Sequence, residues 1–303
     1  MLSRGVAVGV YPSGNGPLYG DFTELKQYID LADGIRPRII SLFSPWRDSW
    51  GYRYPTTANL QTIYNLYPGS VVMWSWEPRG VTLAGINGGV HGGVRDAYID
   101  QVAKSIKAVG RRVLIRFGHE MNGNGGWPRH AQPTNFRAAW RRIVSRFRRV
   151  GVTNAEWVWS PIIMYPNGGL DFRPYYPGDA YVDWTALDGY NWGTVRGDWR
   201  TFREVFRYSM GVIAALSPRG VIIVETGCHS RGPNGGSKDY WFRQTARELK
   251  QNYPHIKGFV YSHMVDERDG EDADWRVDSP AGALAGWRAL VADPQLKATL
   301  VRP

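Results

Sequence analysis

The sequence predicts a (β/α)8 barrel, and two features of the pattern indicate it. Short continuous apolar runs alternate with segments in which apolar residues recur at three- and four-residue steps. The first pattern indicates strands buried on both faces, and the second indicates amphipathic helices. Eight such units in 303 residues fit a barrel that forms one domain. A doubly wound open sheet is the alternative for the same pattern.

The elements follow in order along the chain. Strands are expected at residues 6–10, 39–43, 71–76, 113–117, 156–160, 185–190, 221–225 and 257–262. Helices are expected near residues 21–33, 57–67, 95–110, 134–150, 201–216, 238–252 and 281–292. The helical pattern after the fifth strand is weak. No linker and no change of composition divides the chain, so we expect one catalytic domain over residues 1–303.

Composition favours a carbohydrate partner over a nucleic acid. The 14 Trp and 17 Tyr exceed what packing usually needs, and flat aromatic rings stack well on sugar rings. The net charge of +10 permits an acidic partner. The densest basic cluster, RRIVSRFRRV at residues 141–150, falls on the polar side of an amphipathic helix, and no nucleic-acid motif accompanies it. We therefore expect no nucleic-acid partner.

The sequence gives little information about the cellular compartment of the protein. Its one cysteine, Cys228, cannot form an intrachain disulfide. The first residues, MLSRGVAVGVYPSG, lack the hydrophobic core of a signal peptide and read as a first strand. No apolar run approaches the ~20 residues of a membrane-spanning helix. We expect no membrane partner.

Two glutamates stand where predicted strands end. Glu120 follows the run VLIRFGH, and Glu225 closes the run VIIVE. In a barrel, the residues at the carboxyl ends of the strands form the active site, and the fourth and seventh strands face each other across its mouth. Two carboxylates placed there can act together on one glycosidic bond. A buried salt bridge to Arg116 or another arginine is the alternative for either glutamate.

Several segments resemble glycoside hydrolase family 26, whose members include the β-mannanases. FGHEMNGNGGWP at residues 117–128 is similar to the family's acid/base motif, and VIIVETGC at 221–228 to its nucleophile strand. YYPGDAYVDWTALDGYN at 175–191 and WVWSP at 157–161 resemble the segments of the sixth and fifth strands. The matches span residues 70 to 230.

This resemblance implies a retaining double displacement that requires no cofactor and no metal. Glu225 would be the nucleophile and Glu120 the acid/base residue. Tyr190 would donate a hydrogen bond to Glu225 and help to keep it ionised. Further candidates for substrate binding are His119, Asn122, Trp127, Trp76, Trp192, Trp275 and Arg276.

The resemblance predicts an endo-acting β-1,4-mannanase that is extracellular and monomeric, with a polysaccharide as its partner. The segment YSHMVDERDGEDADWRVD, residues 261–278, departs from the family pattern after the last strand. Because such loops select the sugar, mixed-linkage β-glucan, β-1,3-xylan and an unusual or acidic bacterial exopolysaccharide remain alternative substrates. A barrel that binds carbohydrate without hydrolysing it is the alternative from another class.

Overall fold

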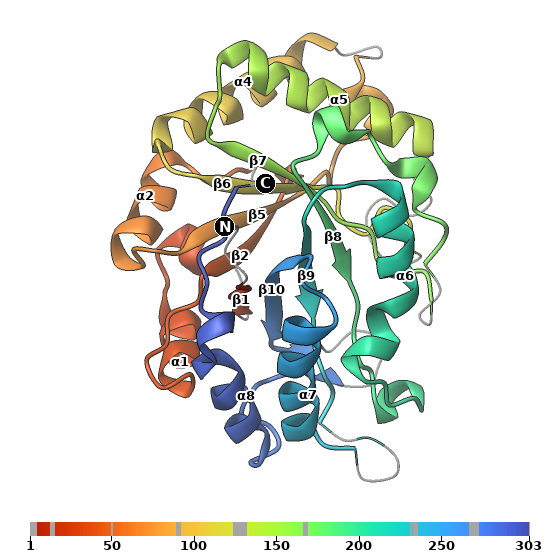
Figure 1. The fold of residues 1–303 in the computed structure, drawn as a ribbon. Helices are drawn as coiled ribbons and strands as arrows, with labels where there is room; N and C mark the ends of the chain where they lie inside the picture. The colour runs from red at the N-terminus through yellow and green to blue at the C-terminus, as the bar shows by residue number, and fades with distance from the viewer. Residues whose placement is uncertain are drawn as a thin grey trace.

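A computed structural model confirms the predicted barrel. It describes residues 5–12, 16–49, 51–88, 92–123, 132–165, 169–230, 232, 236–266 and 273–302. Eight strands close into a ring in the order β1-β10-β9-β8-β7-β6-β5-β2, and all neighbouring pairs are parallel. Helices surround this ring, as Figure 1 shows.

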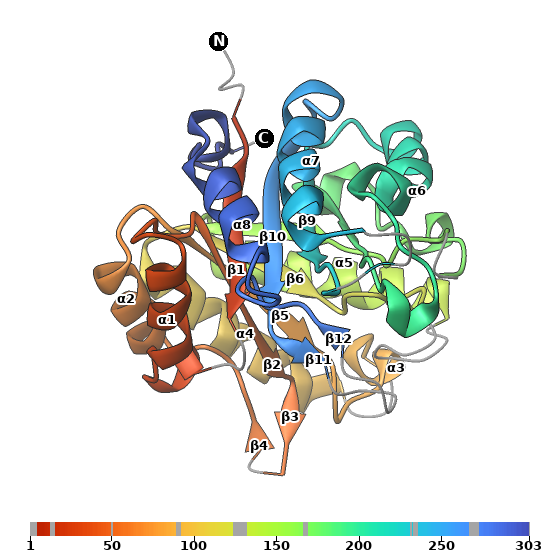
Figure 2. The same cartoon turned by 90° about the horizontal axis from the view of Figure 1, so that it is seen from below.

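The eight barrel strands lie close to their predicted positions. They are β1 (Ala7–Pro12), β2 (Ile39–Pro45), β5 (Val71–Glu77), β6 (Val113–Phe117), β7 (Ala155–Trp159), β8 (Trp184–Asp188), β9 (Val221–Thr226) and β10 (Ile256–His263). Two short antiparallel pairs were not predicted. They are β3 (Arg47–Asp48) with β4 (Gly51–Tyr52), and β11 (Val265–Asp266) with β12 (Ala273–Asp274). Both follow barrel strands and lie on one side of the barrel (Figure 2).

The predicted helices are also present. They are α1 (Thr23–Leu31), α2 (Thr57–Leu66), α4 (Gly92–Val109), α5 (Pro133–Val150), α6 (Phe202–Leu216), α7 (Lys238–Gln251) and α8 (Ala283–Ala292), with a short α3 (Leu83–Ile86) before α4. Between β7 and β8, the described residues contain only the 3-10 turns η2 (Arg173–Tyr175) and η3 (Asp179–Tyr181). This agrees with the sequence, in which the helical pattern after the fifth strand is weak. No helix in the described ranges is long and apolar enough to span a membrane.

The core has two layers because side chains alternate along each strand. Leu114, Met73 and Val224 belong to a cluster inside the barrel, whereas Ile115 and Trp74 belong to the larger cluster between the barrel and the helices. The alternation places Arg116 on the inner face with Leu114. A charged residue therefore points into the barrel from an otherwise apolar strand.

The basic cluster on α5 packs against a neighbouring acidic helix face. Arg142 pairs with Asp96 of α4, and Arg146 pairs with both Asp96 and Asp100. The two helices lie side by side along one edge of the barrel (Figure 1). Part of the basic charge is thus compensated within the fold, which supports the structural interpretation of this cluster.

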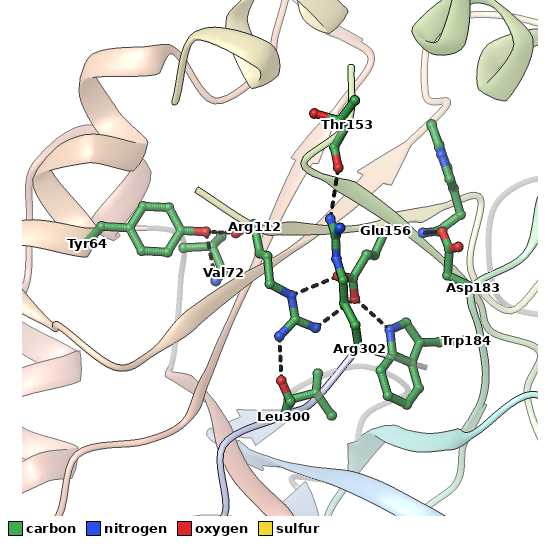
Figure 3. Close-up of polar contacts among 10 residues, drawn as sticks. Tyr64, Val72, Arg112, Thr153, Glu156, Asp183, Trp184, Leu300 and Arg302 are labelled. Atoms are coloured by element: carbon green, nitrogen blue, oxygen red, sulfur yellow. Dashed lines mark hydrogen bonds and ion pairs between the residues drawn. The ribbon is translucent and has the colours of Figure 1, made fainter. Parts of the chain in front are cut away.

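A polar network centred on Glu156 closes the end of the barrel where the strands begin (Figure 3). Arg112 donates two hydrogen bonds of 2.7 Å to this carboxylate. Arg302 donates one of 2.6 Å, and the indole of Trp184 one of 2.9 Å. Burial raises the pKa of Glu156, but these bonds more than offset it and hold the pKa below its ordinary value. The network ties β7 and β8 to the segment after α8.

Glu156→Gln is expected to destabilise the fold by about 3 kcal/mol, because a buried ion pair loses one partner. A carboxyl with a lowered folded pKa contributes stability above its unfolded pKa, and this is lost as pH falls through the folded value. The wild type should therefore lose stability in acid more steeply than the variant. Urea unfolding at pH 7 and pH 4 measures both effects. The exposed Glu24→Gln is the control, with a loss below about 1 kcal/mol; an equal loss in both variants would contradict the prediction.

Candidate active site

The centre of the site is Arg116, a fully buried guanidinium on β6. It pairs with Asp188 at the end of β8 and with Glu225 on β9. It also donates a 3.1 Å hydrogen bond to Ser75 of β5 and lies 5.6 Å from the ring centre of Phe43 on β2. One side chain thus contacts four other strands. The buried salt bridge that was the alternative for either glutamate is present between Arg116 and Glu225.

A bulge in β9 places Glu225 in this cluster. Opposite β8, Leu187 pairs with Ile223, but the next residue, Asp188, pairs with Glu225. One extra residue of β9 therefore lies between these pairs. Val224 and Glu225 can both face inward, although strict alternation would point one of them to the helices. Bulges of this kind re-aim side chains next to active sites.

The surroundings of Glu225 favour its ionised form. Burial would raise its pKa, but Arg116 and then His119 lower it, together with hydrogen bonds from Arg116 and Tyr190. The net effect holds the pKa of Glu225 below its ordinary value. Its side chain is 13% exposed, while those of Arg116 and Asp188 are fully buried. Glu225 is therefore the one carboxylate of this ion-paired trio that a substrate can reach.

Tyr190 donates a 2.8 Å hydrogen bond from its hydroxyl to Glu225 Oε2, as the resemblance implied. Burial and the neighbouring Glu225 carboxylate raise the pKa of Tyr190 well above its ordinary value. The phenol therefore stays protonated and remains a donor. The Ser262 hydroxyl lies 3.1 Å from the Tyr190 oxygen and fixes it from the other side.

Asp188 is a residue of the site that the sequence analysis did not single out. Burial raises its pKa well above the ordinary value, although Arg116 opposes this. The carboxylates of Glu225 and Glu120 raise this pKa further, in the same direction as burial. Ser160 donates a 2.9 Å hydrogen bond to Asp188 Oδ1. The signal in the sequence was the acid within the apolar run TALDGY.

Glu120 lies in a tight turn directly after β6. Its backbone has a φ of 52°, and Gly118 has a φ of 54°. The left-handed region is unfavourable for a residue with a side chain, so the surrounding bonds must hold it. The Glu120 amide donates to the Ser160 carbonyl at 2.8 Å, and the Gly123 amide donates to the Glu120 carbonyl at 2.9 Å. His119 precedes it and meets Phe43 edge-on at 5.4 Å.

Asn122 braces this turn, and its burial argues against the predicted role in substrate binding. Its amide nitrogen donates to the carbonyls of Ile162 and Leu170 at 2.9 and 2.8 Å. Its amide oxygen accepts from the Ile162 amide at 3.0 Å. The side chain is buried and fully engaged with backbone. It fastens the turn of Glu120 to the segment that follows β7.

Trp76 lies in the core, and this placement argues against its predicted role in sugar stacking. It faces the helix layer, because alternation along β5 puts Ser75 inside the barrel and Trp76 outside. Its ring stacks on Trp46 at 4.5 Å and on Trp74 at 4.8 Å. The side chain has no exposed surface.

Trp275 and Trp192 lie beside Tyr190. The Trp275 ring stacks on the Tyr190 ring at 4.2 Å, and it is fully buried, which argues against its predicted role in stacking on a sugar. Trp192 is partly exposed and meets Trp275 edge-on at 5.1 Å. The guanidinium of Arg196 covers one face of Trp192 at 3.7 Å. Trp192 remains a candidate for contact with substrate.

Of the two remaining predicted residues, the structure describes Arg276 but not Trp127. Arg276 is exposed, with 47% of its side chain accessible, and it pairs with Asp274 at 3.1 Å. It remains a candidate for substrate binding. Trp127 lies outside the described residues.

A cavity of about 500 Å³ lies away from these carboxylates, at the end of the barrel where the strands begin. Trp184, Arg219, Lys257 and Arg302 are among the residues that line it. It contains neither Glu120 nor Glu225. The candidate active site therefore rests on the charge cluster at the opposite end.

A closed parallel barrel with clustered carboxylates at its carboxyl end matches the architecture of barrel glycosidases. The model of glycosyl hydrolase family 26 matches residues 83–263. Endoglucanase H of Acetivibrio thermocellus is 30% identical over 299 residues, which cover 96% of this chain and 30% of that protein. The chain therefore belongs to glycoside hydrolase family 26.

Other relatives differ in the substrate that their names state. A mannan endo-1,4-beta-mannosidase of Bacillus subtilis is 32% identical over 56% of this chain and 45% of that protein. A beta-1,3-xylanase of an Alcaligenes species is 24% identical over 73% of this chain and 47% of that protein. The chain thus spans half or less of the length of these curated relatives. The catalytic domain of an endo-beta-1,4-mannanase from a Bacillus species shares the fold, with a TM-score of 0.70, 19% identity, and coverage of 97% of this chain and 87% of that one.

Proposed function

We propose that this protein is a retaining endo-β-1,4-mannanase in which Glu225 is the nucleophile and Glu120 the acid/base residue. The observation that carries the proposal is the state of Glu225: ionised through Arg116 and Tyr190, and the exposed member of its ion-paired cluster. An ionised carboxylate at the strand ends is what a glycosidase nucleophile requires. The mannanase named among the relatives supports mannan as the substrate.

The reaction would run in two displacements. Glu225 attacks the anomeric carbon while Glu120 protonates the departing oxygen, which gives a glycosyl-enzyme. Glu120 then takes a proton from water, the water attacks the anomeric carbon, and Glu225 leaves. Tyr190 and Arg116 hold the charge on Glu225 before attack and after release. His119, beside Glu120, would contact the sugar at the reacting centre.

A β-glucan is the second candidate substrate. It is favoured by the likeness to a protein named endoglucanase, which extends over 96% of this chain. Mannan and mixed-linkage β-glucan both contain β-1,4-linked hexoses, and these hexoses differ in the configuration of the hydroxyl on C2. The groups around that hydroxyl would therefore decide between them, and we propose His119 and Trp192 as candidates for this role.

The test is the release of reducing ends from glucomannan, galactomannan, mixed-linkage glucan, β-1,3-xylan and an acidic exopolysaccharide. Release from the mannans with an early fall in viscosity supports an endo-mannanase. Release from mixed-linkage glucan alone supports the second candidate. Proton NMR of the first product gives its anomeric configuration, and a β product supports retention. Binding to a polymer without any release would favour the carbohydrate-binding barrel and overturn the proposal.

A further inference from the structure

Trp275 is held tightly against the residues around the proposed nucleophile. Its ring stacks on Tyr190 at an interplanar angle of 24°, and the Tyr190 hydroxyl bonds to Glu225. On another side it lies against Gly227, two residues after Glu225. A Cβ atom at Gly227 would lie only 2.5 Å from Trp275 Cγ. The position of Trp275 thus bears on the position of Tyr190.

The backbone around Trp275 is bound by Lys238, the first residue of α7. The Lys238 ammonium donates to the carbonyl of Asp274 at 2.9 Å and to the carbonyl of Arg276 at 2.8 Å. These two carbonyls flank Trp275 in the chain. The Lys238 side chain therefore binds the backbone on both sides of Trp275.

Histidines and one main-chain bond complete the attachment. His263 Nδ1 accepts from the Val277 amide at 3.0 Å, and His229 Nδ1 accepts from the Asp274 amide at 3.2 Å. The Trp275 amide donates to the Met264 carbonyl at 2.9 Å. Few of these bonds belong to regular secondary structure, so the segment depends on buried side chains for its place.

Burial of the charged Lys238 ammonium is energetically unfavourable. The residue is fully buried, and among the described residues its hydrogen-bond acceptors are two neutral carbonyls. The carboxylate of Asp274 pairs with Arg276 instead. Burial lowers the pKa of Lys238 to about 8, so the ammonium is charged near neutral pH and its hydrogen bonds are charge-assisted. The charged and titratable groups that act on it are Cys228, His263, Asp274, Arg276 and Asp278.

We propose that Lys238 is a positioning residue of the active site, which holds Trp275 against Tyr190 and thereby fixes the Tyr190 hydroxyl on Glu225. This inference rests on the proposed function for its effect on catalysis. A buried ammonium that grips a loop backbone serves geometry more than stability, since burying its charge is unfavourable. A displacement of about 1 Å at a reacting group can cost about 100-fold in rate.

A double-mutant cycle tests this route of action. Lys238→Met keeps the length of the side chain and removes its donors, and kcat/KM should fall roughly 10- to 100-fold, mainly through kcat. In a Tyr190→Phe background the same change should have little further effect, because the hydroxyl through which Lys238 acts is gone. Lys238→Arg, which keeps charge and donors, should recover much of the activity. Should Lys238→Met fail to fold, Lys238→Gln takes its place in the cycle.

Lys250→Met is the matched control, because Lys250 lies on the same helix and pairs with Asp293 far from Trp275. It should leave kcat/KM unchanged. Wild-type activity in Lys238→Met, or an undiminished effect in the Tyr190→Phe background, would overturn the proposal.

A second measurement does not depend on the substrate. In protein labelled with 5-fluorotryptophan, the fluorine NMR signal of Trp275 is assigned through Trp275→Phe. It should shift in Lys238→Met and stay in place in Lys250→Met. If the wild type hydrolyses none of the five polymers, the proposed function fails while this signal still decides the role of Lys238. An unshifted signal in Lys238→Met would refute that role.

Discussion

Glu225→Gln is expected to lower hydrolysis of the responsive polysaccharide by at least about 10⁴-fold, comparable to removal of a nucleophile in other covalent mechanisms. Glutamine keeps the size of the side chain, but a neutral amide cannot form the glycosyl-enzyme. Its amide oxygen can still accept from Arg116, and its amide nitrogen, in the place of Oε2, can donate to the Tyr190 oxygen, so the fold should be retained. Initial rates of reducing-end release, with melting temperature as the check on folding, measure the effect.

Azide separates the roles of the two glutamates. In Glu225→Gly, azide can enter the vacated space and attack the anomeric carbon directly, which gives a glycosyl azide of inverted configuration. In Glu120→Ala, azide should instead attack the glycosyl-enzyme and give a product of retained configuration. An activated aryl glycoside supplies a leaving group that departs without an acid. The opposite pairing of variants and products would exchange the two assignments.

Arg116→Met is expected to have the second large effect, on stability and on pH dependence together. The change leaves the carboxylates of Asp188 and Glu225 without their shared cation, which should cost at least about 3 kcal/mol. It also removes the strongest influence that lowers the pKa of Glu225. The acid limb of kcat/KM should therefore move to higher pH, because the ionised nucleophile is lost as pH falls through a raised pKa.

Arg112→Met is the control for this effect. Arg112 stands four residues earlier in the chain and pairs with Glu156 at the other end of the barrel. Its loss should lower stability and leave the acid limb in place. An unmoved acid limb in Arg116→Met, measured on protein that remains folded, would contradict the assignment of Glu225 as the ionised nucleophile.

The barrel could be predicted because its strands are buried on both faces and therefore appear as uninterrupted apolar runs. The segment between β7 and β8 could not, since hydrogen bonds from side chains organise it. The Trp157 amide donates to Asp183 at 2.7 Å, and Asn122 binds the backbone of Ile162 and Leu170. Such bonds have no periodicity along the chain.

The site was predictable at the level of strand ends but less so at the level of side-chain direction. Glu225 was found because it ends an apolar run, yet its inward direction depends on a bulge that no local pattern announces. Ser75 pairs in register with Arg116, which points into the barrel, so Ser75 also points inward. Because side chains alternate along a strand, its neighbour Trp76 must then face the helices. Trp275 was near the site as expected, but neighbouring aromatic rings cover it.

The left-handed backbone at Glu120 has a consequence for the evolution of such barrels. A residue with a Cβ in this conformation costs the fold about 1 kcal/mol, a cost that glycine would not carry. Under the proposed role of Glu120, selection for hydrolysis would maintain the glutamate against this gain in stability. In a lineage released from that selection, replacement by glycine is immediately favourable. Such a descendant would keep Glu225 and lack the acid/base group, and we would expect it to bind polysaccharide without hydrolysing it.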